Sequence, residues 1–287
     1  MPNTPQPPPA PATTAIRALA QDCDALLICA GAGMGVDSGL PDFRGDQGFW
    51  NAYPALGEAG LRFVEVANPA TFAADPTLAW GFYGHRLQLY RQTRPHAGFG
   101  ALLALGAHYA HGSFVFTSNV DGQFQQAGFA SDRIVECHGS IHHLQCSLPC
   151  SERIWSARDF EPDVDTRRCR LRSALPRCPH CGAIARPNIL MFGDPAWVAG
   201  RTEAQEARLA RWQSRVRRPL VVELGAGLHV PTVRLFAEGA GGVLLRINPR
   251  DAGTRGTQAL SLPMRAAAGI ERIAAALRPD HPPRTGV

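Results

Sequence analysis

Six consecutive apolar residues, 25–30, lead directly into a glycine turn formed by Gly31, Ala32 and Gly33. A short, uninterrupted apolar run is typical of a strand buried on both faces of a parallel sheet. Because glycine has no Cβ, the backbone after such a strand can turn tightly and bring its N–H groups close to a pyrophosphate. The stretch therefore predicts an α/β fold with a dinucleotide site, although a purely structural turn has the same sequence.

The residues after this turn do not match the pattern of a nicotinamide dehydrogenase. Val36 stands where that pattern has a third glycine, and Pro41 interrupts a helix soon after the turn because it lacks an N–H donor. Asp42, Phe43 and Arg44 follow, and we expect a loop there instead of a crossover helix. An acid, an aromatic ring and a guanidinium beside a dinucleotide indicate that the cofactor is cut or covered, and not used as a hydride carrier.

Strand-like and helix-like segments alternate along the chain, which favours a Rossmann-like, doubly wound parallel sheet. Ligands of such sheets bind beyond the carboxyl ends of the strands, so the segments that follow the strands should meet at one crevice. The four clearest strands are residues 25–30, 113–117, 220–224 and 242–247.

The length of 287 residues and the 45% hydrophobic content are enough for one large domain and a small accessory module. The expected organisation follows from composition along the chain. It is a Pro-rich disordered tail at residues 1–12, a Rossmann-like dinucleotide-binding domain at 13–138 and 187–278, an inserted module at 139–186, and a flexible tail at 279–287.

Charge and hydropathy argue against several classes of protein. The formal net charge is +5, and the basic residues are scattered, so nucleic-acid binding is not indicated. No apolar run approaches the roughly 20 residues that a membrane span needs. The N-terminus lacks the basic start and apolar core of a secretory signal. We expect a soluble, cytoplasmic protein.

The segment 139–186 holds five of the eight cysteines, and four of these lie in two close pairs. The pairs are Cys146 with Cys150 and Cys178 with Cys181. Two thiol pairs joined by a loop suit a tetrahedral zinc, and four thiolates leave no open position, so such a metal would be structural. Disulfides are the alternative, which the missing export signal disfavours. Cys169 and His180 are further possible ligands.

Residues with catalytic capacity follow the second predicted strand. Asn119 and Asp121 close that strand with an amide and a carboxylate, and His138 comes shortly after. An imidazole titrates near neutrality and can take a proton from a ribose hydroxyl, an amide can hold a water, and a carboxylate can bind a carboxamide. The alternative is that Asn119 and Asp121 cap the next helix and that His138 packs near the zinc module.

Taken together, the order and spacing of these motifs resemble the sirtuin family of NAD-dependent protein deacylases over about residues 20 to 275. The motifs are GAGMGVDSGLPDFRG, TSNVDGQFQQAGF, CHGS, the two cysteine pairs, RPNILMFGD, ELGAGLHVP and the pair Ile247-Asn248. The resemblance implies a Rossmann-like fold with an inserted zinc module, NAD as a consumed co-substrate, and an acylated lysine of a protein or peptide as the substrate.

The resemblance also implies roles for individual residues. His138 resembles the general base, Asn119 the residue that orders a water, and Asp121 the residue that binds the nicotinamide amide. Phe192 and Gly193 resemble the segment that pairs with an extended substrate peptide. The residues implied to contact NAD are Gly31, Ala32, Gly33, Asp42, Phe43, Arg44, Ser118, Asn119, Asp121, Gly225, Ala226, Gly227 and Asn248.

The implied mechanism consumes NAD. Breaking the bond between nicotinamide and ribose leaves oxocarbenium-like character on the sugar, and the acyl-lysine oxygen captures that carbon. A neutral His138 then activates a ribose hydroxyl to attack the resulting imidate, and water completes the cycle. The products would be free lysine, nicotinamide and an O-acyl-ADP-ribose.

Tyr83 and Arg86 lie three residues apart on a predicted helix and therefore share a face. Their spacing matches the pair with which some sirtuins hold the carboxylate of succinyl- or malonyl-lysine, and a guanidinium with a phenol suits that anion. The chain thus resembles a divergent, bacterial-type member of the desuccinylase or demalonylase kind. The alternative is an aromatic core stripe with a solvated arginine.

Several positions depart from the family pattern. Gly35 replaces a serine, Ser118 a glutamine, Ala226 and Gly227 a Thr-Ser pair, and Asp194 a glutamate. These changes leave two other classes of function open, one catalytic and one not. The chain could transfer ADP-ribose to a protein or hydrolyse NAD at the same site, or it could be a non-catalytic NAD-binding interaction module.

Overall fold

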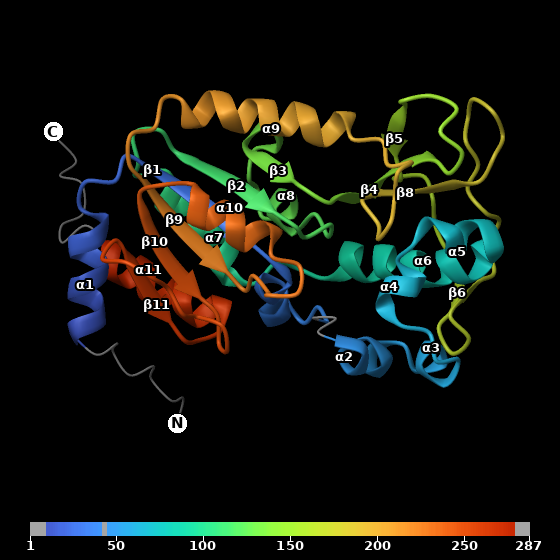
Figure 1. Cartoon of the computed structure of the whole chain (residues 1–287), viewed down its shortest axis with the longest axis horizontal. Coiled ribbons are helices and arrows are strands. Elements are labelled where there is room, and N and C mark those ends of the chain that lie inside the picture. Colours follow the sequence, from blue (N-terminus) through green and yellow to red (C-terminus); the bar gives the residue numbers. More distant parts are fainter. Residues whose placement is uncertain (1–9, 42–44, 279–287) are drawn as a thin grey trace, which may run out of the picture.

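The computed structural model of the chain describes residues 10–41 and 45–278. A parallel sheet of six strands forms the middle of the larger of two lobes, in the order β11-β10-β9-β1-β2-β3 (Figure 1). The strands are β1 (Ala25–Ala30), β2 (Ser113–Thr117), β3 (Ile134–Glu136), β9 (Pro219–Leu224), β10 (Val243–Ile247) and β11 (Ala259–Leu262). The sheet confirms the predicted Rossmann-like fold and adds β3 and β11 to the four predicted strands.

Helices cover both faces of this sheet, which is why β1 and β9 are buried along their whole length. Leu26 and Ile28 face one cluster of helices, and Leu27 and Cys29 face the other. The first cluster contains α1 (Ala10–Ala20), α7 (Ala97–Gly106), α8 (Gln123–Gln126) and α11 (Ala266–Leu277). The second contains α9 (Gly200–Gln213) and α10 (Thr232–Gly239).

A second lobe lies beside the carboxyl end of the sheet and combines helices with small antiparallel sheets (Figure 1). Its helices are α2 (Gly45–Ala52), α3 (Pro54–Glu58), α4 (Phe63–Val66), α5 (Pro69–Ala74) and α6 (Pro76–Gln92). Its strands are β4 (Gly139–Cys146), β5 (Ile154–Ser156), β6 (Val164–Asp165), β7 (Arg170–Leu171) and β8 (Ala185–Ile189). One hydrophobic cluster joins these helices to these strands.

The domain boundaries differ from the expected ones in three places. Helices α2 to α6 share a core with the zinc module, although the sequence assigned them to the large domain. The predicted module boundary at residue 186 falls inside β8. Helix α1 begins at Ala10, inside the expected tail of residues 1–12, because proline is tolerated in a first helical turn. Residues 1–9 and 279–287 of the two predicted tails lie outside the described part of the chain.

The segment after β1 forms two short 3₁₀ helices, η1 (Ala32–Met34) and η2 (Val36–Ser38), and no long helix follows before Pro41. This agrees with the predicted interruption at Pro41. The cofactor-loop residues Asp42, Phe43 and Arg44 lie outside the described residues. A third 3₁₀ helix, η3 (Ser131–Arg133), precedes β3. Among the described residues, no helix has the length and apolar content to cross a membrane.

Candidate functional site

The turns that follow β1 and β9 lie against each other at the carboxyl end of the sheet. The N–H of Gly31 donates to Leu224 O at 2.9 Å, and the N–H of Gly33 donates to Gly225 O at 3.1 Å. A Cβ on Gly31 would lie 2.8 Å from Ala226 Cα, and one on Gly225, whose φ is +59°, would lie 2.4 Å from Gly33 Cα. Glycine is therefore needed at 31 and 225 for the two turns to pack, a reason that sequence reasoning did not supply.

The segment after β2 docks onto the first of these turns. The N–H of Ser118 donates to Ala30 O at 3.2 Å, and Asn119 Nδ2 donates to Gly31 O at 3.0 Å. The N–H of Asn119 in turn donates to Thr117 Oγ1 at 3.0 Å. Two segments that are far apart in the sequence are thus brought together at one edge of the sheet.

Asp121 is buried beside them, and its carboxyl Oδ1 accepts the N–H of Gln123 at 2.9 Å. Gln123 is the first residue of α8, whose N-cap is Gly122 and makes no side-chain capping bond. Asp121 therefore bonds one N–H at the start of the helix without being its cap residue, and Asn119 bonds to the glycine turn instead. Burial raises the pKa of Asp121 to about 6. The carboxyl group is therefore ionised at neutral pH at a cost in desolvation, as expected of a group that binds a polar ligand.

His138 lies between β3 and β4 and is half-buried. Burial lowers its pKa, so the imidazole is neutral at pH 7 and can accept a proton. The backbone on both sides is fixed. Cys137 N–H donates to Thr117 O at 2.9 Å, and Gly139 has a φ of +76° and approaches Asn188 O so closely that a Cβ would lie 2.1 Å from it.

Helix α9 holds the end of β3 just before His138. Glu136 forms an ion pair with Arg201, its backbone O accepts Thr202 Oγ1 at 3.1 Å, and its N–H donates to Gln205 Oε1 at 3.0 Å. Sequence reasoning missed these α9 residues. No motif marks them, because only the packing of α9 on β3 brings them to Glu136.

The turn after β9 is also fastened to the end of β10. Asn248 is fully buried, and its Nδ2 donates to Ala226 O at 2.9 Å. Asn248 Oδ1 accepts the N–H groups of Arg250 and Asp251 at 3.1 and 3.0 Å. A Cβ on Gly227, by contrast, would meet nothing within 4 Å. The side chain of Asn248 thus organises the two loops, and a contact with the adenosine ribose stays a prediction.

The chemistry of this edge fits a dinucleotide. The N–H groups of Gly31, Gly33 and Gly225 are bonded within the turns, so a pyrophosphate at this edge would meet the N–H groups of neighbouring turn residues. Asn119 and Asp121 offer an amide and a carboxyl group beside the turns. Gln123, which sequence reasoning missed, is buried, and neither polar atom of its side chain has a hydrogen-bond partner in the described chain. Its Oε1 lies 3.5 Å from the Cβ position at Gly35, where the family pattern has a serine.

Phe192 and Gly193 form an exposed turn after β8. The N–H of Phe192 donates to Ala67 O at 3.0 Å, and Gly193 has a φ of +61°. The turn is held from within by Asp194, whose carboxylate forms a bidentate, buried ion pair with Arg186 at 2.7 and 2.8 Å. An exposed segment on a rigid base is suited to pairing with a peptide, which stays a prediction for these residues.

Tyr83 and Arg86 are both buried on α6. Tyr83 stacks on Phe72 with ring centroids 5.7 Å apart, and Arg86 lies over the rings of Phe82, Tyr83 and Tyr90. Arg86 Nε and Nη2 both donate to Tyr90 Oη, at 2.9 and 2.7 Å. The aromatic core stripe that the alternative interpretation expected is present, but Arg86 is buried and not solvated. Its hydrogen-bond partner, Tyr90, was not predicted from the sequence.

The four paired cysteines meet at one point between β4 and β8. Their Sγ atoms all lie within 4.8 Å of one another, with 3.6 Å between those of Cys146 and Cys181 and 3.7 Å between those of Cys150 and Cys178. Zinc–sulfur bonds of about 2.3 Å give a tetrahedron with edges of about 3.8 Å, so the cluster fits a structural zinc. Within the described chain, Cys169 and His180 do not belong to this group.

Comparisons with known proteins agree with this geometry. The sequence model of the Sir2 family matches residues 31–211. The chain belongs to the Sir2 family. Relatives of this Sir2-family chain include an NAD-dependent protein deacylase of Thermococcus sibiricus, 28% identical over 79% of this chain and 82% of the relative. NAD-dependent protein deacylase 1 of Archaeoglobus fulgidus is 30% identical over 78% of this chain and 81% of the relative.

Solved structures of Sir2 proteins have the same fold. A mutant Sir2 homologue in complex with ADP-ribose superposes with a TM-score of 0.67 at 25% identity, covering 92% of this Sir2-family chain and 95% of the other. Sir2Tm bound to a propionylated peptide gives a TM-score of 0.62 at 20% identity, over 92% and 97% of the two chains. The second likeness shows the fold alone.

Proposed function

We propose that this Sir2-family chain is an NAD-dependent protein lysine deacylase that converts NAD, an acyl-lysine and water into nicotinamide, O-acyl-ADP-ribose and free lysine. The observation that carries the proposal is the meeting of three segments at one sheet edge. Asn119 bonds to the turn at Gly31, and Asp121 lies buried two residues further along the same segment. A neutral His138 follows β3, the strand that pairs with β2. The names of the relatives, NAD-dependent protein deacylases, support the same reaction.

In this proposal each residue has one task. NAD supplies an activated ribose carbon when its bond to nicotinamide breaks. Asp121 accepts the nicotinamide amide, Asn119 holds a water, and the glycine turns receive the pyrophosphate on backbone N–H groups. His138 takes the proton of a ribose hydroxyl, which its lowered pKa allows at neutral pH. The turn at Phe192 and Gly193 pairs with the substrate peptide.

We assign the acyl end of the substrate to the α6 side, where Tyr83 and Arg86 are buried. A guanidinium in this surrounding favours an acyl group that ends in a carboxylate, such as succinyl or malonyl. The proposal includes a cytoplasmic location. None of the eight cysteines forms a disulfide, which suits a reducing compartment and a zinc bound by four thiolates.

The test is incubation with NAD and a panel of acetyl-, malonyl- and succinyl-lysine peptides, with the products identified by mass spectrometry. We expect O-acyl-ADP-ribose and the free peptide in equal amounts. His138→Ala should abolish both products while leaving the zinc content unchanged. The control is His143→Ala in β4, which should still form both products. Free ADP-ribose alone would indicate NAD hydrolysis, ADP-ribosylated protein would indicate transfer, and NAD binding without nicotinamide release would indicate a binding module.

A further inference from the structure

The start of β4 is fastened to the loop that carries Asp121. The N–H of Ile141 donates to Val120 O at 3.1 Å. One residue further on, the link is made by a side chain, because His142 Nε2 lies 2.8 Å from the backbone O of Asp121. The small module therefore reaches the candidate site through His142.

The form of His142 in this contact is determined by its partner. A carbonyl oxygen only accepts, so Nε2 carries the hydrogen and donates it. Burial lowers the pKa of His142, so the neutral ring with hydrogen on Nε2 is the form present at pH 7. The ring also lies against Gly122, where φ is +74° and a Cβ would be 2.8 Å from both Cδ2 and Nε2. Only glycine at 122 leaves room for the imidazole.

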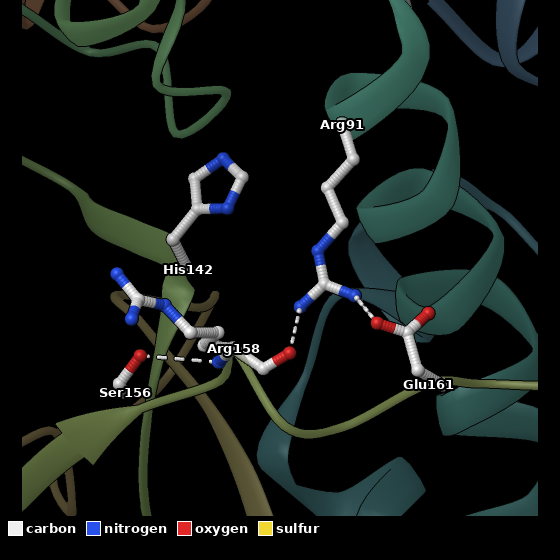
Figure 2. Close-up of a pocket in the computed structure, with 5 residues that line it drawn as sticks. All are labelled: Arg91, His142, Ser156, Arg158 and Glu161. Carbon is white, nitrogen blue, oxygen red and sulfur yellow. Dashed lines mark hydrogen bonds and ion pairs between the residues drawn. The ribbon is translucent and has the colours of Figure 1, made fainter.

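His142 is itself held from the other side. The N–H of Ala157 donates to His142 O at 2.9 Å, and Arg91 Nη2 donates to Ala157 O at 2.7 Å. The imidazole and Arg91 line a pocket with a volume of about 400 Å³. The two side chains lie on opposite sides of this pocket (Figure 2). The other lining residues, all exposed, are Ser156, Arg158 and Glu161. Because the ring borders an open pocket, shortening it does not create a sealed cavity.

We propose that His142 is a positioning residue for the nicotinamide end of the NAD site, an inference that rests on the proposed function. Asp121 is held twice, by Gln123 N–H on its carboxyl Oδ1 at 2.9 Å and by His142 on its backbone O. These two bonds fix the direction in which the carboxyl group meets a nicotinamide amide. Without the imidazole the 121–122 peptide can rotate, whereas the glycine turns that receive the pyrophosphate keep their own contacts.

The test compares NAD with ADP-ribose, which lacks nicotinamide, by calorimetric titration of each variant. His142→Met removes the donor, and we expect about five- to tenfold weaker NAD binding, as for one lost hydrogen bond, with ADP-ribose binding unchanged. His142→Gln places an amide N–H near the position of Nε2 and should bind NAD within about twofold of the wild type. The control is Arg158→Gln, which changes the same pocket without touching Asp121 and should bind both ligands as the wild type does.

The nicotinamide exchange rate should fall in His142→Met and stay near the wild-type rate in His142→Gln and Arg158→Gln. The KM for the acyl-peptide should be unchanged in all three variants. An equal loss of NAD and ADP-ribose binding in His142→Met would show a merely structural role and overturn the inference, as would unchanged NAD binding. Should His142→Met not fold, His142→Asn takes its place, because its shorter amide does not reach Asp121 O. A wild type that binds NAD but releases no nicotinamide refutes the proposed function alone. The ratio of the affinities for NAD and for ADP-ribose still decides the role of His142 in that case.

Discussion

Neutralising Asp194 should destabilise the protein strongly and also loosen the turn proposed to pair with the substrate peptide. The Asp194 and Arg186 side chains are 0% and 1% exposed and join through two bonds of 2.7 and 2.8 Å. Asp194→Asn keeps the size and shape of the side chain but leaves the charge of Arg186 buried without a counter-charge. Breaking a buried pair in this way costs about 3–5 kcal/mol. At about 2–4 °C per kcal/mol for a domain of this size, Tm should fall by roughly 6–20 °C.

The assay is thermal unfolding, with peptide and NAD kinetics measured below the transition. Asp163→Asn is the matched control, because Asp163 pairs with Arg172 at the same 2.8 Å but with side chains 58% and 61% exposed. Solvent screens that pair, so Tm should hardly change. We expect Asp194→Asn to raise the KM for the peptide and not the KM for NAD, because Asp194 Oδ2 also accepts the N–H of Met191 at 3.3 Å at the start of the turn. Equal, small Tm shifts in the two variants would refute the reasoning.

Three further predictions concern acyl choice, pH and the metal. Arg86→Met should lower succinyl-peptide turnover at least about tenfold relative to acetyl-peptide turnover, because the charge-assisted bonds to the carboxylate are lost; an unchanged ratio removes Arg86 from acyl selection. Burial raises the pKa of Asp121 from 3.8 to about 6, so the stability this group contributes at low pH is lost as pH rises through about 6. Asp121→Asn should therefore have a higher Tm than the wild type at pH 8 but no advantage at pH 4, and should release nicotinamide more slowly; a lower Tm than the wild type at pH 8 would contradict this. A strong zinc chelator should lower Tm and abolish deacylation, because the four thiolates lose their common ligand; a chelated protein that melts as before would show that the cysteine cluster needs no metal.

Much of the sheet could be predicted because its residues are buried on both faces. Residues 25–30 are a continuous apolar run with the observed bounds of β1, and residues 113–117, apolar at 114–116, match the bounds of β2. Strands β3 and β11 were missed. Ile134–Glu136 is only three residues long, and Ala259–Leu262 is buried at Leu262 alone, so neither has a periodic signal of useful length.

The candidate site also has a part that could be predicted from the sequence and a part that could not. Glycines, paired cysteines and polar residues after a strand follow local rules, so Gly31, Cys178 and Asp121 could be selected from the sequence. Partners from distant segments could not. Gln123 near Gly35 and the α9 side chains on Glu136 depend on how helices pack against the sheet or on one another. Tyr90, by contrast, lies four residues after Arg86 on the same helix, so a local helical rule was enough to find it.

The sequence by itself determined the Rossmann-like class, the cysteine pairs and the residue types at the strand ends, because these depend on apolar periodicity, ligand spacing and glycine's lack of a side chain. Only the tertiary structure decided that helices α2 to α6 share a core with the zinc module and that the two glycine turns lie in backbone contact. Both depend on contacts between residues far apart in the chain. Such contacts are selected by shape and burial in three dimensions, which a local pattern does not encode.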